Sequence, residues 1–295
     1  MDLHGLTSAP LARRLGALLL AVAVVGAVAL AVAAGAFHHG GGRWFVVTSS
    51  SMGEAAPVGT LVLTEPTRAS GPSADLRVGD VVTFRPPTVP GEVYTHRVAS
   101  IGADGVRTSG DTTGAVDPWL LGDDDLVGRA VALLPGVGWL VRGLPWLALG
   151  ALAVWAVGTR LRSDSARSAF RLVAGCAVVL GVVSVLRPFV GAVLLSTTVD
   201  AAGRGVAHVV STGLVPVRVA AEGGGHADLV SGAVGQVPVP AGASAVDLTT
   251  SLHLPVVGWV VVALICASPL IAVLTLGLPA GEPRAERGRR RAEPA

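Results

Sequence analysis

The sequence predicts a membrane protein with about four transmembrane helices, an all-β extracytoplasmic domain and a small second β-module. Three observations support this fold class. Of the 295 residues, 51% are hydrophobic and only 14% are charged, whereas a soluble domain usually carries about 25% charged residues. Several long apolar runs punctuate the chain. The segments between them consist of short β-prone runs separated by Gly, Pro and Asp.

The apolar runs set the expected membrane spans. A bilayer core needs about 20 apolar residues of helix, and we expect helices over 15–37, 144–158, 172–195 and 255–278. A cleavable signal peptide is the alternative for the first run, but the hydrophobic region of such a peptide has only about 7–15 residues. We therefore expect a retained anchor. The second run is short, and its helix begins near Val137 if Arg142 snorkels to the interface.

Arginine clusters orient these spans. They precede the first run, separate the second from the third, and follow the fourth: Arg13, Arg14; Arg160, Arg162, Arg167, Arg171; Arg284, Arg287, Arg289, Arg290, Arg291. The positive-inside rule places all three clusters in the cytoplasm. We thus expect residues 1–14 and 159–171 to be cytoplasmic, and 279–295 to form a disordered cytoplasmic tail. Residues 38–143 and 196–254 then face outwards.

Both outer segments are predicted to be β structure. In the first, strand candidates lie at 44–48, 61–63, 81–84, 93–95 and 127–131. In the second, they lie at 206–210, 214–219 and 245–248, which suggests about half a sandwich. About 60 residues are marginal as an independent fold, so we expect this module to pack against the first domain or a partner.

Short motifs follow one another in a fixed order along the first outer segment. They are Ser49-Ser50-Ser51-Met52, Pro57-Val58-Gly59, Val78-Gly79-Asp80-Val81, Tyr94-Thr95-His96-Arg97, Thr108-Ser109-Gly110-Asp111 and Leu126-Val127-Gly128-Arg129. Each motif alone is common, but the ordered set resembles the signal peptidase I family, in its ER, archaeal and sporulation-type branch. Members of that branch carry S-x-S-M, P-x-G, G-D-V/I, T-H-R, G-D and V-G-K/R motifs in this order. The resemblance covers about residues 46–135.

One compositional fact agrees with this branch, whose catalytic base is histidine. The chain contains no lysine, so any mechanism that needs a neutral lysine as general base is excluded. Arginine cannot replace it, because the guanidinium stays protonated.

The resemblance implies specific roles for a few residues. Ser51 would be the nucleophile and His96 the general base. Asp117 and Asp111 are both candidates for the carboxylate that orients His96; the resemblance favours Asp117 and leaves Asp111 a supporting role. The backbone N–H of Ser51, with the Ser49 hydroxyl as a second candidate, would form the oxyanion hole. The sequence departs from the family in having Gly53-Glu54 where Glu-Pro usually follows the methionine.

The predicted function is that of a membrane-bound serine endopeptidase of the signal peptidase I type, which removes signal peptides from exported pre-proteins. It would be a multi-pass protein of the cell membrane with its catalytic domain outside. Expected partners are pre-proteins with signal peptides, the lipid bilayer and accessory membrane subunits. No cofactor, metal ion or nucleic acid is expected. The alternative is a non-catalytic membrane scaffold that uses the same β-fold to bind extended peptides.

Overall fold

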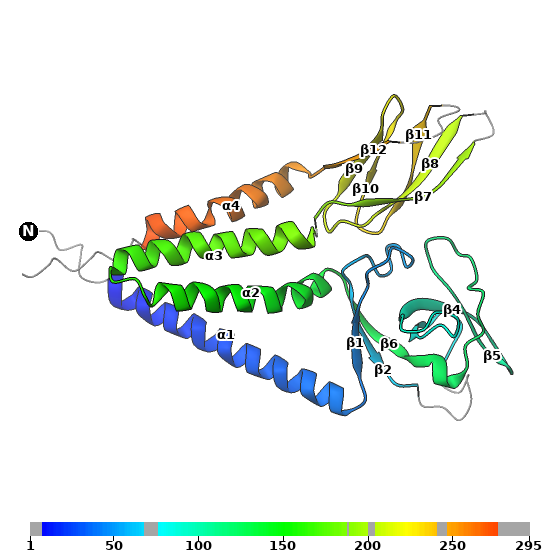
Figure 1. Cartoon of the computed structure of the whole chain (residues 1–295), viewed down its shortest axis with the longest axis horizontal. Coiled ribbons are helices and arrows are strands. Elements are labelled where there is room, and N and C mark those ends of the chain that lie inside the picture. The colour runs from blue at the N-terminus through cyan, green and yellow to red at the C-terminus, as the bar shows by residue number, and fades with distance from the viewer. Residues whose placement is uncertain (1–7, 68–75, 188, 200–203, 241–246, 277–295) are drawn as a thin grey trace, which may run out of the picture. The chain divides into compact units, whose positions relative to one another are not determined.

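A computed structural model describes residues 8–67, 76–187, 189–199, 204–240 and 247–276 (Figure 1). The chain divides into two compact units. The first comprises Met1–Arg142 and Arg187–Pro255 and contains both β-regions together with helix α1 (Ser8–His39). The second comprises Gly143–Leu186 and Val256–Ala295 and is built from helices.

The described helices follow the apolar runs of the sequence. Besides α1, they are α2 (Val137–Gly158), α3 (Asp164–Leu186) and α4 (Val256–Leu276). Within the described ranges, α2 and α3 are long and apolar enough to cross a membrane, by length and composition, and Val256–Ser268 is a shorter apolar helical stretch. The structure therefore provides two clear candidate spans, fewer than the expected number of about four.

The helix boundaries differ from the expected ones. Helix α2 begins at Val137, as expected if Arg142 snorkels; the Arg142 guanidinium lies over the Trp139 ring, 5.5 Å from its centroid. The helix expected over 172–195 instead runs from Asp164 to Leu186, so that prediction is wrong at both ends. At its start, the Ser163 hydroxyl accepts a hydrogen bond from the Ala166 N–H, as an N-cap residue does.

The end of α3 has a local cause. Arg187 has a positive φ of 48° and precedes a proline, and the residue before a proline is disfavoured in the α conformation. The apolar residues that follow form a strand, β7 (Ala192–Val199), rather than more helix. The second β-module therefore begins at Ala192 and not at 196. The expected cytoplasmic residues 1–7 and tail 279–295 lie outside the described residues.

The β-region between α1 and α2 forms one six-stranded antiparallel sheet. Its strands are β1 (Arg43–Val46), β2 (Leu61–Glu65), β3 (Val81–Phe84), β4 (Tyr94–Gly102), β5 (Gly105–Ser109) and β6 (Leu126–Leu134). Their order in the sheet is β1-β2-β6-β3-β4-β5. Strand β6 is the last of these six strands in the sequence. It pairs with both β2 and β3 and so joins β1-β2 to β3-β4-β5. The sequence predicted all of these strands except β5.

Two apolar clusters support this domain. One gathers residues of β3, β4 and β5 with one residue before β3 and one after β5: Leu76, Val82, Phe84, Val98, Val106, Leu121. The other surrounds the loop between β1 and β2: Val47, Met52, Ala56, Val62. Burial of these side chains fixes the loop that follows β1 against the sheet.

The second module is a sandwich of two three-stranded sheets. One sheet has the order β10-β9-β12, from β9 (Val217–Ala221), β10 (His226–Leu229) and β12 (Leu248–Leu252). The other has the order β11-β8-β7, with β8 (Gly205–Ser211) and β11 (Val234–Val239). Both sheets contribute to one core, for example Val209 and Val237 from one and Val217 and Val219 from the other. The expectation of half a sandwich is therefore wrong.

Candidate active site

Ser51 lies in the loop between β1 and β2, and this loop is tied at both ends. The Val47 N–H donates to the Thr60 carbonyl (2.9 Å), and the Gly59 N–H donates to the Val47 carbonyl (2.8 Å). Next to Ser51, the Met52 side chain is fully buried in the core. A buried side chain directly after the serine restrains the serine backbone, so the position of the hydroxyl is set by packing.

His96 lies in β4, in a central part of the sheet. It is paired with Val82 of β3, and only 6% of the residue is exposed. The rings of Phe84 and Tyr94 approach the imidazole edge-on, with centroid distances of 6.0 and 5.9 Å. These rings leave the imidazole little freedom to rotate.

Asp117 follows β5 in a loop and reaches back to His96. Its Oδ2 lies 2.7 Å from His96 Nδ1, and His96 Nε2 lies 2.9 Å from Ser51 Oγ. An ionised carboxylate can only accept hydrogen bonds, so His96 Nδ1 carries the proton of this contact. Nε2 is then free to accept the Ser51 hydroxyl proton. The three side chains form the arrangement of a serine–histidine–aspartate triad.

Comparison with protein families bears on this geometry. Residues 15–114 match the family model described as signal peptidase, peptidase S26. Over these residues, the chain is similar to signal peptidases. The match contains Ser51 and His96 but ends before Asp117.

Signal peptidases share several general properties. Signal peptidases are membrane-associated serine peptidases, and they act on pre-proteins that carry signal peptides. No curated protein and no solved structure shows significant similarity to the chain.

Asp111, the other predicted candidate, makes a different contact in this β-domain. Its carboxylate forms a two-point ion pair with Arg97, at 2.9 Å to Nε and 2.6 Å to Nη2. Arg97 also donates to the Gly79 carbonyl (2.8 Å). The hydrogen bonds that Arg97 donates to Asp111 raise the pKa of Arg97 above its ordinary value. The structure thus brings Ser51, His96 and Asp117 together and directs Asp111 to the arginine beside His96.

Two residues near the triad received no role from the sequence. The Thr108 hydroxyl donates to Asp117 Oδ2 (2.6 Å). At Gly110, an added Cβ would lie 2.8 Å from the Ser51 carbonyl oxygen and 3.4 Å from His96 Nε2, so only glycine fits there without movement. Both residues belong to the Thr108–Asp111 motif, but which of its side chains face the triad depends on the pairing of β5 with β4.

A groove of about 250 Å³ opens beside Ser51. Two extended segments line it, 45–49 and 92–95, and Ser51 itself contributes to its wall. Of the lining residues, Glu92 alone is charged, and its carboxylate accepts a hydrogen bond from the Tyr94 hydroxyl (2.7 Å). This contact raises the pKa of Tyr94. In the same groove, Ser49 Oγ lies 3.1 Å from Ser51 Oγ.

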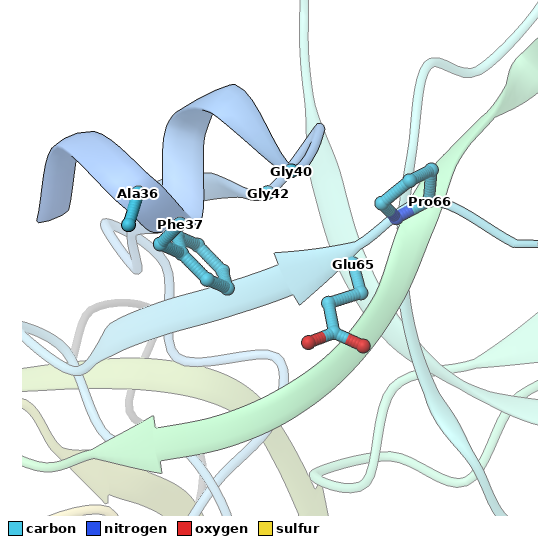
Figure 2. Close-up of a pocket in the computed structure, with 6 residues that line it drawn as sticks. All are labelled: Ala36, Phe37, Gly40, Gly42, Glu65 and Pro66. Atoms are coloured by element: carbon cyan, nitrogen blue, oxygen red, sulfur yellow. The ribbon is translucent and has the colours of Figure 1, made fainter. Parts of the chain in front are cut away.

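A second hollow, of about 320 Å³, lies where α1 and β2 end (Figure 2). Ala36 and Phe37 of α1, Gly40 and Gly42 line it on one side, and Glu65 and Pro66 on the other. It contains none of the triad residues. The groove beside Ser51, and not this hollow, is therefore the candidate substrate site.

Proposed function

We propose that the protein is a signal peptidase I that cleaves exported pre-proteins by a Ser/His mechanism, with Ser51 as nucleophile, His96 as general base and Asp117 as the orienting carboxylate. The observation that carries this proposal is the chain of contacts from Ser51 Oγ through the His96 ring to Asp117, at 2.9 and 2.7 Å. These distances lie within hydrogen-bond reach, about 2.6–3.2 Å, which proton transfer requires.

The contacts support a two-step reaction. His96 Nε2 takes the proton of Ser51 Oγ while the oxygen bonds to the scissile carbonyl carbon. The resulting imidazolium is stabilised by Asp117, and it gives its proton to the leaving amine as the peptide C–N bond breaks. A water molecule, deprotonated by the same imidazole, then attacks the acyl-enzyme and releases the carboxyl end of the signal peptide.

The negative oxygen that develops at the carbonyl needs hydrogen-bond donors. The backbone N–H of Ser51 is the first candidate. The Ser49 hydroxyl is the second, because its oxygen lies 3.1 Å from Ser51 Oγ and points into the same groove. The turn that follows uses Gly53 at a φ of +52°, a conformation that glycine adopts readily. Gly53-Glu54, which stands where the family usually has Glu-Pro, thus begins with a residue suited to a tight turn.

The groove suits an extended peptide. It lies along two extended segments, and β1 is an edge strand of the sheet, so a substrate segment can add to this region by backbone pairing. We place this domain on the outer face of the cell membrane, where a signal sequence still anchors its pre-protein. Helices α1 to α4 would be the four spans, with the arginine-rich segments inside.

The test is processing of a pre-protein by the full-length protein in lipid vesicles. Ser51→Ala should abolish release of the mature product, and Ser50→Ala, which removes the neighbouring hydroxyl, should not. Mass spectrometry of the product should locate the cut at the end of the signal sequence. If the Ser51→Ala variant processes the pre-protein as fast as the unaltered protein, the proposal is wrong and the scaffold alternative gains support.

Membrane orientation needs its own measurement. In a variant without Cys176 and Cys266, a single cysteine at Ala103, in the turn between β4 and β5, should react in intact cells with a maleimide that cannot cross the membrane. A cysteine at Ser163, between α2 and α3, should react only after the cells are opened. The reverse pattern would contradict the proposed orientation.

A further inference from the structure

Thr108, a fully buried residue, donates a hydrogen bond from its hydroxyl to the Asp117 carboxylate of the triad. Thr108 lies in β5 and has no exposed surface. We infer that Thr108 is a positioning residue, whose hydroxyl holds the Asp117 carboxylate in the orientation that His96 needs. This inference rests on the proposed Ser/His mechanism.

The strand register explains why Thr108 reaches the triad. Thr108 is paired with Val98 of β4, so the two side chains share one face of the sheet. His96 lies two residues before Val98 and therefore points to that same face. Thr108 is thus the diagonal neighbour of His96, close enough for one group to contact both side chains. Asp117 is that group.

Thr108 holds Asp117 at two points. Its carbonyl oxygen accepts a hydrogen bond from the Asp117 backbone N–H (2.8 Å). Its hydroxyl donates to Asp117 Oδ2 (2.6 Å), the same oxygen that lies 2.7 Å from His96 Nδ1. The backbone contact fixes where the aspartate begins, and the hydroxyl fixes how its carboxylate is rotated. Asp117 belongs to no strand, although its neighbour Val116 forms an isolated antiparallel bridge with Ser109. The contacts with Thr108 and this bridge together set the position of Asp117.

Because the Asp117 carboxylate is mostly buried, its position depends strongly on the Thr108 hydroxyl. The Asp117 side chain is 12% exposed and the His96 side chain 8%, so little water is available to satisfy a carboxylate that loses a donor. Hydrogen bonds to charged groups are among the strongest in proteins. Without the hydroxyl, the carboxylate keeps one of the two side-chain donors that contact it among the described residues, His96, and can turn away from Nδ1. The imidazole then loses its orienting partner, although no atom that touches substrate has changed.

The experiment separates this role from simple packing. Thr108→Val keeps the branched shape of the side chain and removes the hydroxyl. In the vesicle assay, we expect kcat to fall about ten- to a hundred-fold, the size of effect that loss of one charge-assisted hydrogen bond produces, while KM stays unchanged. Thr64→Val is the matched control. Thr64 is also buried in a strand of this sheet, and its hydroxyl donates to the Arg43 carbonyl (3.2 Å), away from the triad, so kcat should stay within about twofold.

A double-mutant cycle decides between positioning and structure. In the Asp117→Ala background the hydroxyl has no carboxylate to hold, so Thr108→Val should cause no further loss of activity, measured over long incubations. A purely structural role would cause the same loss in both backgrounds. If Thr108→Val fails to fold, Thr108→Ser and Thr108→Ala replace it. Both lack the methyl group and only serine keeps the hydroxyl, so serine should be at least about fivefold more active.

The outcomes are distinct. A Thr108→Val kcat within twofold of the unaltered protein, an equal loss in the Asp117→Ala background, or equal activity of the serine and alanine variants would each overturn this inference and leave the Ser/His proposal intact. Failure of the Ser/His proposal itself would appear separately, as full processing by Ser51→Ala.

Discussion

The close approach of Gly110 to Ser51, in the loop between β1 and β2, leads to a specific prediction. Gly110→Ala adds one methyl group, whose carbon would lie 2.8 Å from the Ser51 carbonyl oxygen and 3.3 Å from Ser51 Cβ. The first distance is shorter than Cβ contacts in proteins allow, and the atom in the way is backbone. The two loops must therefore separate, and the Ser51 hydroxyl must move with them.

The size of the effect follows from these distances. An ordinary contact begins at 3.4 Å, so the loops must separate by about half an ångström. A displacement of about 1 Å at reacting groups costs about a hundredfold in rate. We therefore expect kcat to fall about tenfold or more. Unfolding free energy should fall by about 1–2 kcal/mol, the usual cost of overpacking.

The assay is pre-protein processing, with tryptophan fluorescence as the check on folding. Gly102→Ala is the matched control, because it lies at the end of β4 and its added Cβ would meet nothing closer than 3.8 Å. The control should keep nearly full activity. A Gly110→Ala protein that is folded and as active as the control would refute the argument that this contact positions Ser51.

Three further predictions concern the same domain. Asp117→Asn should lower kcat about 10³–10⁴-fold by disturbing the histidine tautomer, whereas Asp111→Asn should cost less than about tenfold, and equal losses would contradict the assigned contacts. The sequence contains one tyrosine, Tyr94, so the ionisation of this side chain is measurable by ultraviolet absorbance. The pKa of Tyr94 should lie above its ordinary value, because the hydroxyl donates to Glu92. Glu92→Gln should lower the pKa of Tyr94. Gly59→Ala should lower the melting temperature by several degrees, because φ is +86° and the added Cβ would overlap a tryptophan indole; an unchanged melting temperature would contradict the packing described there.

Local patterns made part of this structure predictable. The order of the short motifs predicts Ser51 and His96 as a candidate pair. Short β-prone runs separated by Gly, Pro and Asp predict most strands of the β-domain. These signals lie within a few consecutive residues. The structure brings the two side chains within hydrogen-bond distance, which is the relation that the sequence required of them.

Other features depend on information that local patterns lack. The role of Thr108 depends on which residue of β4 lies opposite it, and a register is a long-range property. The run after Leu186 illustrates a second difficulty, because valine and leucine are compatible with both a buried helix and a strand. There the chain changes from α3 to β7 at Arg187, and the apolar composition continues across the change.

The position of β6 in the sheet has a consequence for folding during synthesis. Ser51 belongs to the half of the sheet formed by β1 and β2, and His96 to the half formed by β3, β4 and β5. The strand that unites them is synthesised after both and leads almost directly into α2. A nascent chain therefore contains both Ser51 and His96 before the strand that joins their two halves of the sheet has been made. The contact between these two side chains can be supported by the complete sheet only after translation has passed Leu134.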